Sequence, residues 1–233
     1  MPAPVLVLLA AGLVAQIVWH GVRPPPTARA IDLPSPPSAD ALAMSSLGDP
    51  VATAKLLMLW LQAHDNQPGV SIPFASLDYA TVAGWLTRIL ELDPRGQYPL
   101  LAASRIYASV NDEARQRYIL DFVYRKFFED PGQRWPWLAH AAIVAKHRLA
   151  DLPLALKYAR AVSEHARGPG VPDWARDMPL VILEEMGELE AARVMAGYLL
   201  SSGRVKAEHE KRYLMQKLEE LETRARDEGG AVQ

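Results

Sequence analysis

The sequence contains no cysteine, and this absence excludes a whole set of chemistries. Disulfides, thiolate metal sites, iron–sulfur clusters and a cysteine nucleophile all need that residue, and the 233-residue chain has none. The chain also lacks a basic excess, since 25 Lys and Arg stand against 27 Asp and Glu. Nucleic-acid binding depends on a positive surface, so this balance disfavours it. The apolar fraction of 50% is ample for a packed core and excludes a disordered chain.

The motifs of catalysis and cofactor binding are missing as well. There is no HExxH, no phosphate-binding loop, no dinucleotide fingerprint and no nucleophile elbow. His140 and His147 share a helix face, but no acid beside them completes a ligand set, which favours surface histidines over a metal site. Glu184 and Glu185 are neighbours on a helix and point about 100° apart, so they cannot share a substrate. We therefore expect no enzyme, no cofactor and no metal.

Charge is absent from the first 19 residues, and this run predicts a transmembrane or signal-anchor segment over residues 1–22. Trp19 and His20 stand where interfacial residues are expected. A cleaved signal peptide is the rival interpretation, because Ala28-Arg29-Ala30 has the form of a cleavage site, although it lies far from the apolar run and no Lys or Arg precedes that run. A buried helix is the third alternative, and the proline-rich exit argues against it.

Residues 23–49 are predicted to form an extended linker. Seven of the 27 residues that begin at Pro24 are proline, which stiffens a chain and favours extended structure. We expect proteases to cut between Arg23 and Ser46. The orientation is open: Arg23 and Arg29 follow the apolar run and favour a cytoplasmic body, whereas the cleavage-like tripeptide suggests export. We favour a single-pass protein of the inner membrane with its body on the periplasmic side.

From residue 50 onward, apolar residues recur at helical spacing, and no stretch shows the alternation of a strand, which predicts an all-α body over residues 50–204. The first of these helices is apolar nearly all round, as a helix packed on both sides would be. The expected helices are 51–63, 77–92, 98–110, 112–129, 135–150, 153–167, 172–186 and 188–202, with a last one over 205–227.

A repeat of 37 residues runs through these helices. Asp93-Pro94 and Asp130-Pro131 are one such interval apart, and a further interval takes Trp137 to Trp174. A fixed period of this length is the signature of a helical solenoid. We interpret each Asp-Pro pair as the stop of a helix, because the residue before a proline is disfavoured in helical conformation.

These features resemble the tetratricopeptide-like (TPR-like) repeats over residues 50–202, about four αα-hairpins. Small residues at Ala155, Ala159, Ala191 and Ala192 look like the positions where two helices of such a hairpin approach closely. The repeat is longer than the usual 34 residues, and the Leu-Gly-x-x-Tyr of a first helix is not intact. With its apolar start and proline-rich linker, the chain is similar to membrane-tethered bacterial envelope proteins of that type.

The last helix, within residues 205–233, carries Leu214, Leu218, Leu221 and Ala225 on one stripe and charged pairs on the other side. A solenoid needs a terminal helix with one polar face, so we interpret this segment as a capping helix. The alternative is half of a two-stranded coiled coil, which would make the protein a homodimer.

The resemblance implies a groove that binds a protein partner. Aromatic and arginine side chains dominate binding hot spots. The candidates are Arg105, Arg125 and His140, which lie outside the apolar stripes, and Trp137, which lies near a helix start at the edge of a stripe. We expect a membrane-tethered scaffold that mediates protein–protein interactions in the assembly or organisation of an envelope complex. The alternatives are a helical-repeat subunit of a lytic or hydrolytic envelope enzyme and a permanent structural subunit of a membrane complex.

Overall fold

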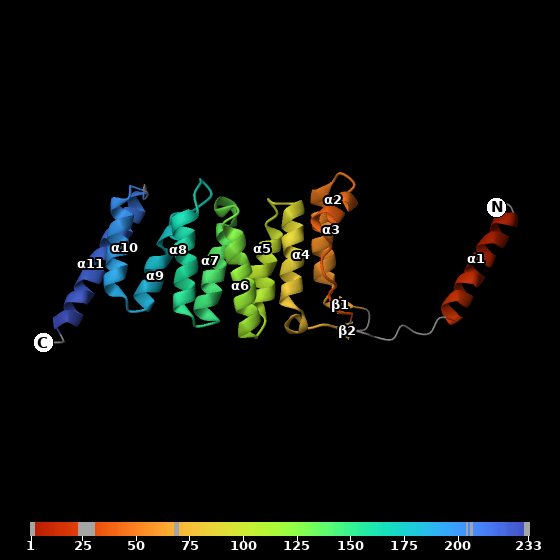
Figure 1. The fold of residues 1–233 in the computed structure, drawn as a ribbon, viewed down its shortest axis with the longest axis horizontal. Coiled ribbons are helices and arrows are strands. Elements are labelled where there is room, and N and C mark those ends of the chain that lie inside the picture. Colours follow the sequence, from red (N-terminus) through yellow and green to blue (C-terminus); the bar gives the residue numbers. More distant parts are fainter. Residues whose placement is uncertain (1–2, 23–30, 68–69, 204, 206, 231–233) are drawn as a thin grey trace.

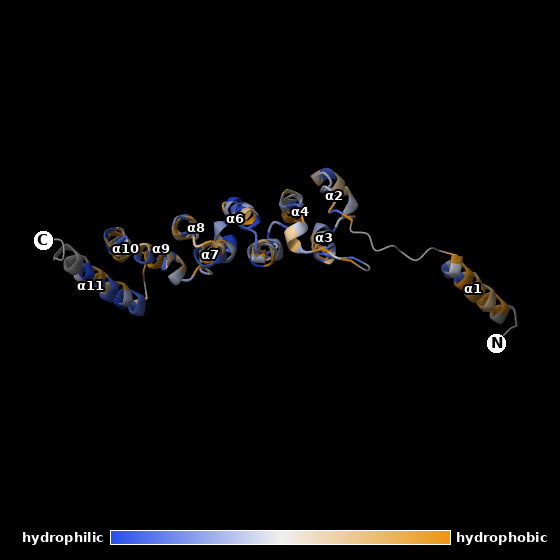
Figure 2. Cartoon of the chain, turned by 90° about the horizontal axis from the view of Figure 1, so that it is seen from below, coloured by the Kyte–Doolittle hydropathy of each residue, from blue (hydrophilic) through white to orange (hydrophobic). Residues whose placement is uncertain are grey.

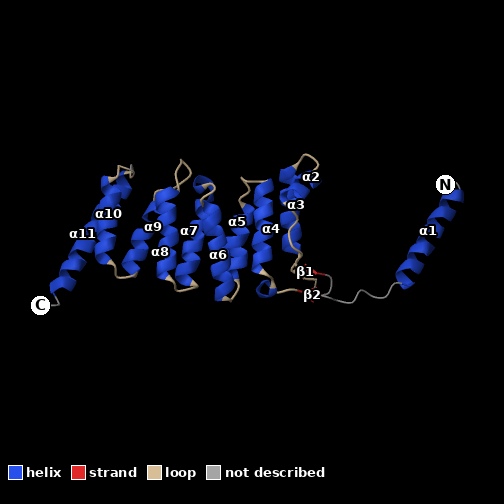
Figure 3. Ribbon diagram, in the orientation of Figure 1, coloured by secondary structure: helices blue, strands red, loops and turns tan. Residues whose placement is uncertain are grey.

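The computed structural model describes residues 3–22, 31–67, 70–203, 205 and 207–230. Helices dominate these residues, so the prediction of an all-α body is confirmed (Figures 1 and 3). A two-stranded antiparallel hairpin, β1 (Asn66–Gln67) and β2 (Val70–Ser71), follows the third helix. The helices are α1 (Ala3–Val22), α2 (Ala39–Ser45), α3 (Pro50–Ala63), α4 (Tyr79–Leu92), α5 (Tyr98–Leu101), α6 (Glu113–Phe127), α7 (Pro131–His147), α8 (Leu152–His165), α9 (Trp174–Glu185), α10 (Leu189–Ser201) and α11 (Glu208–Gly230).

The helices from α2 onward form two layers. Seen along their axes, α2, α4, α6, α8 and α10 make one row, while α3, α7, α9 and α11 make the other (Figure 2). From α6 onward, each helix packs against the next in the chain, and α3 packs against α4 in the same way. Helices α5 and α7 are also in contact, which places α5 in the second row. The described chain is thus a linear stack of antiparallel helices rather than a bundle around one centre.

Aspartate begins helix after helix in this stack. The side chain of Asp130 accepts a hydrogen bond from the backbone N–H of Gln133 at 3.2 Å, and Pro131 occupies the first helical position, where its missing N–H costs nothing. The helix before each Asp-Pro pair does end there, since α4 ends at Leu92 and α6 at Phe127, but Asp130-Pro131 also begins α7, four residues before the expected start at 135. The same kind of cap precedes α3 (Asp49), α4 (Asp78), α6 (Asp112) and α8 (Asp151).

The helix expected over 98–110 is present but irregular. After α5, the chain forms a π-helical turn over Ala102–Ile106 and a 3-10 turn over Tyr107–Ser109. A π turn inserts an extra residue into the helix, and such turns are frequent at functional positions. Arg105 lies in this turn and is exposed.

The core runs along the interface between the two rows. Ala155 and Ala159 of α8 are fully buried, and so is Ala192 of α10, as expected where helices approach closely. The larger gaps are filled by side chains such as Phe127 and Tyr158, which are almost fully buried. Burial raises the pKa of the Tyr158 hydroxyl, because the charged form would lose its hydration.

The first helix of the stack, α3, was expected to be packed on both sides and is not. It is the end helix of its row in Figure 2, and Leu56 and Leu59 are 65% and 62% exposed. Its buried face, which includes Ala54, Met58 and Leu61, packs on α4.

The segment expected as a free linker is held to the stack over part of its length. The indole Nε1 of Trp85 donates to the carbonyl of Pro34 at 2.7 Å, and Gln67 and Ile31 exchange two hydrogen bonds of 2.8 and 2.9 Å. Residues 39–45 form α2, whose Leu42 is buried against the stack. The expected protease sites between Arg23 and Ser46 thus include residues with tertiary contacts; residues 23–30 lie outside the described part of the chain.

Helix α1 carries no charged residue and stands apart from the stack in Figures 1 and 2. Apolar side chains along it are exposed, Leu8 and Leu9 by 73% and 63%. Searched over the described residues, no helix combines the length and the apolarity needed to cross a membrane.

At the other end, α11 packs along α10, with Leu214 and Leu221 buried and Leu218 partly buried. These three leucines of the predicted stripe are therefore covered within the chain, while the side chain of Ala225 lies outside the described part; the capping role stays a prediction. The homodimer stays a prediction.

Candidate functional site

A cavity of about 720 Å³ lies between α7, α9 and α11. All three helices belong to the same row of the stack (Figure 2). Most of its lining is aliphatic or aromatic, with a small set of acidic groups and a basic rim. The lining residues are Ala142, Ile143, Lys146, His147, Pro172, Asp173, Trp174, Asp177, Met178, Val181, Ile182, His209, Glu210 and Tyr213.

Helical spacing explains how these side chains converge. On α9, Trp174, Asp177 and Val181 follow at intervals of three and four residues, which places them along one face. On α11, Glu210 and Tyr213 are three residues apart and share a face in the same way. Trp174 and Tyr213 are 55% and 47% exposed, so the cavity has aromatic surface open to solvent.

Two acidic side chains of this cavity are buried, and the protonated carboxyl of Glu210 hydrogen-bonds to the carboxyl groups of Asp177 and Asp173 rather than to a basic side chain. Asp177 is 8% exposed and Glu210 is 6% exposed. Among the described residues, no basic side chain pairs with Asp177 Oδ1 or with either carboxyl oxygen of Glu210. The nearby guanidinium of Arg176 binds Asp173 through Nη1 at 3.1 Å. A buried carboxylate without a donor is costly, because it has lost the water that would solvate its charge.

The pKa values of the two acids follow from this environment. Burial raises the pKa of Asp177 to about 6, and the negative charge of Asp173 adds to the effect. Burial raises the pKa of Glu210 to about 7, with further contributions from the close approach of Asp173 and from the charge of Asp177. The ionisation of each acid therefore depends on the state of the other.

The basic groups at the cavity are engaged elsewhere or exposed. Lys146 of α7 pairs with Glu185 of α9 at 2.6 Å. His147 and His209 line the rim and are exposed. No cluster of three His, Asp or Glu residues suited to a metal ion occurs within the described ranges.

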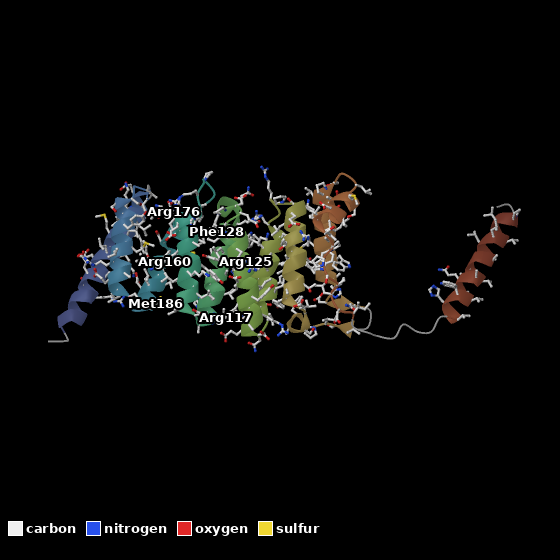
Figure 4. All side chains as sticks on the ribbon, viewed as in Figure 1. Arg117, Arg125, Phe128, Arg160, Arg176 and Met186 are labelled. Atoms are coloured by element: carbon white, nitrogen blue, oxygen red, sulfur yellow. The ribbon has the colours of Figure 1, made fainter. Side chains whose placement is uncertain are left out.

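The structure distributes the four sequence-predicted residues over both rows. Arg105 in the π turn and His140 on α7 are close enough to interact, since burial and the charge of Arg105 lower the pKa of His140. Trp137 lies one turn earlier on α7, and its indole Nε1 donates to Gln97 Oε1 at 2.7 Å. Arg125 lies on α6 in the other row and pairs with Asp121 at 3.0 Å. Figure 4 shows Arg125 on the same helix as Arg117, apart from Arg176 near the cavity.

Sequence reasoning missed Asp177, Glu210 and Tyr213, and it gave Trp174 only as part of the repeat. The sequence did contain a signal for Glu210. This residue is four positions before Leu214, so it lies on the same helix stripe as Leu214, Leu218 and Leu221. An acid at a stripe position of an amphipathic helix is unusual and marks a polar contact in the core.

A smaller cavity of about 320 Å³ lies between α3, α4 and the start of α5, with Met58, Leu59 and Tyr98 among its lining residues. Hollows thus occur at two places along the row that contains α3, α7, α9 and α11. Comparison of the chain with protein-family models, with curated proteins and with solved structures finds no match in any of the three.

Proposed function

We propose that this protein is a membrane-attached scaffold that binds a protein partner along the row of α3, α5, α7, α9 and α11. Stacked αα-hairpins of this kind are similar to TPR-like solenoids, whose inner row of helices offers a long surface free of core packing. We propose that the partner interaction serves the assembly or organisation of an envelope complex. In a variant of the same function, the protein is a permanent structural subunit of that complex.

The observation that carries this proposal is the aromatic cavity between α7, α9 and α11. An opening of about 720 Å³ with half-exposed Trp174 and Tyr213 offers anchoring surface of the kind that dominates protein interfaces. Ile143 and Val181 add exposed aliphatic surface beside them. A contiguous apolar patch of this kind marks an interaction site more often than chance exposure.

Attachment to the inner membrane is the second part of the proposal, and α1 carries it. The helix has 20 residues without a charged side chain, and its apolar groups are exposed. Burial of these groups in lipid would remove them from water. We place the helical stack on the periplasmic side. Fractionation of cells expressing the full chain and a chain lacking residues 1–22 tests this part, since only the full chain should sediment with membranes.

Site-specific photo-crosslinking in native membranes tests the partner. A benzoylphenylalanine at position 143, where Ile143 is 47% exposed, should capture a defined protein. The matched control is position 118 on α6, where Tyr118 is 42% exposed in the other row. Equal yields at both positions, or no adduct at 143, would count against the scaffold.

A hydrolytic subunit is the second candidate, and one observation favours it. General acid–base catalysis requires acids whose pKa values lie near the working pH, and the raised pKa values of Asp177 and Glu210 meet that requirement. Purified protein incubated with envelope polymers would decide the matter. Turnover that is lost in both Asp177→Asn and Glu210→Gln would favour the enzyme over the scaffold.

A further inference from the structure

The charge balance of the cavity between α7, α9 and α11 is the feature that leads beyond a general binding role. Three carboxyl groups, those of Asp173, Asp177 and Glu210, face one guanidinium, that of Arg176, which binds Asp173. Lys146 lines the same cavity, but its ammonium pairs with Glu185 at 2.6 Å. Within the described part of the chain, the cavity therefore holds more acid than its own cations compensate.

Among the described residues, no cation donates a hydrogen bond to Asp177 Oδ1 or to the Glu210 carboxyl group, so this acid pair is placed to receive a cation from outside. Both are more than nine-tenths buried, and both line the cavity. A bound ammonium or guanidinium would supply the N–H groups that Asp177 Oδ1 and Glu210 lack, in a setting where low polarity strengthens the attraction. The cost of burying the acids would then be offset by the bound ligand.

The rest of the lining fits the stem that carries such a cation. Lys and Arg side chains bury their methylene groups along apolar surface and keep the charged head on a polar group. Met178, Val181 and Ile182 supply apolar surface, and Trp174 and Tyr213 supply aromatic faces that attract cations. A small inorganic cation would make no use of this surface.

We propose that the cavity receives a lysine or arginine side chain of the partner protein, with its charged head between Asp177 and Glu210 and its stem against Trp174 and Tyr213. This inference rests on the proposed scaffold function and names the chemistry that its partner presents. The cavity is then a specificity pocket, because a partner with a neutral residue at that point would leave the ionised acid pair without a compensating cation.

The inference implies that binding releases protons. A cation that binds the pair favours its ionised form, so affinity should rise as the pH increases from about 5.5 to 8 and the acids lose their protons. The other titratable groups at the site are either ion-paired or at the exposed rim. The groups that face the pair are Lys146 and His147 from α7, Asp173 and Arg176 from α9, and His209 from α11.

The probe for a test is butylammonium, with n-butanol as a neutral control of the same chain length. The full chain, in non-ionic detergent, is labelled with 5-fluorotryptophan, and the Trp174 resonance is assigned with Trp174→Phe. We expect a saturable shift of that resonance with millimolar affinity, tighter at pH 8 than at pH 5.5, and a shift with butanol less than a third as large. A response to butanol as large as that to butylammonium would overturn the inference.

Acid replacements supply the second arm of the test. The double variant Asp177→Asn with Glu210→Gln should weaken butylammonium binding at least tenfold. It should remain folded, because each amide replaces an acid whose ionised form is costly in the buried site. Glu190→Gln is the control, since Glu190 lies on α10 and pairs with Arg193 at 2.6 Å. Unchanged affinity in the double variant refutes the assignment of these two acids.

The crosslinking experiment separates this inference from the scaffold itself. If position 143 captures a partner and the double variant captures it equally well, the scaffold stands and the lysine or arginine pocket is wrong. If the double variant loses the adduct and butylammonium binding together, both are supported. If butylammonium binds but no partner is captured, the cavity serves a free small amine, and the inference as stated is overturned.

Discussion

The free energy of unfolding of the wild-type chain should fall as the pH rises, and replacement of Glu210 by glutamine should reduce this fall. The folded-state pKa of Glu210 is about 7, above its ordinary value of 4.5, so the folded chain holds this proton more tightly than the unfolded chain does. The stabilisation that comes from the bound proton is complete below pH 4.5 and is lost as the pH rises through 7. Asp177, with its pKa raised from 3.8 to about 6, acts in the same direction.

The size of the effect follows from the same values. A pKa raised from 4.5 to about 7 corresponds to about 3 kcal/mol of folding free energy between acid and alkaline pH, at about 1.4 kcal/mol for each tenfold change in the acidity constant. Because Asp177 responds to the same charges, the contributions of the two acids are not additive. Glutamine keeps a buried polar group, so we expect Glu210→Gln to gain about 2 kcal/mol over the wild-type chain at pH 8, and close to nothing at pH 5.

The assay is urea unfolding of the full chain at pH 5, 6, 7 and 8, followed by helical circular dichroism. Stacked hairpins can open from one end, so amide exchange of α11, corrected for the intrinsic pH dependence, should accompany it. Glu190→Gln is the matched control. A hydrogen bond from Arg193 lowers the pKa of Glu190, so the stabilisation that Glu190 contributes to the folded chain is lost as the pH falls rather than as it rises. If the free energy of unfolding changes with pH in the same way for the wild-type chain and for Glu210→Gln, the reasoning is refuted.

Three further predictions concern the stack itself. Asp151→Ala removes the cap of α8 and should cost about 1–2 kcal/mol in urea unfolding, whereas Asp121→Ala, which removes only an exposed ion pair, should cost less than about 0.5 kcal/mol. Trp85→Phe removes the hydrogen bond to the Pro34 carbonyl, a loss of about 1 kcal/mol, and should speed chymotryptic cleavage within residues 31–46, after Leu42 or Met44, about fivefold. Leu138→Ala creates a cavity in the core and should cost about 2–5 kcal/mol by the same unfolding measurement.

Local signals in the sequence predicted the helices because each helix carries its own pattern. The apolar stripe of α4, with Val82, Leu86 and Ile89, is visible without knowing what it packs against. The ends of the helices were harder to predict, because the same residue pair can either end one helix or begin the next. Asp130-Pro131 fits a helix end, because a residue before proline avoids helical conformation, and it fits a helix start, because Asp caps and Pro suits the first turn. In the structure both occur within four residues: α6 ends at Phe127 and α7 begins at Pro131, with Asp130 as its cap.

Contacts between distant residues were beyond the reach of such signals. Trp85 donates to Pro34 across 51 positions of sequence, and nothing in a proline-rich segment indicates that its carbonyls find a partner. The same holds for the end position of α3: a helix that is apolar all round is expected in the middle of a core, yet in a linear stack the first helix has a neighbour on one side only.

The acid pair illustrates how a site of this kind could be found in stacked hairpins. Asp177 and Glu210 are 33 residues apart, which is close to one repeat, so a helix and its equivalent in the next hairpin bring them together. In the sequence, each acid taken by itself looks like an ordinary solvent-exposed charged residue. Each nevertheless lies on the face by which its helix packs, where a charged side chain is retained at a cost. Two such acids one repeat apart therefore predict a buried acidic pair between successive helices of one row, and under the proposal made above a lysine or arginine of the partner compensates its charge.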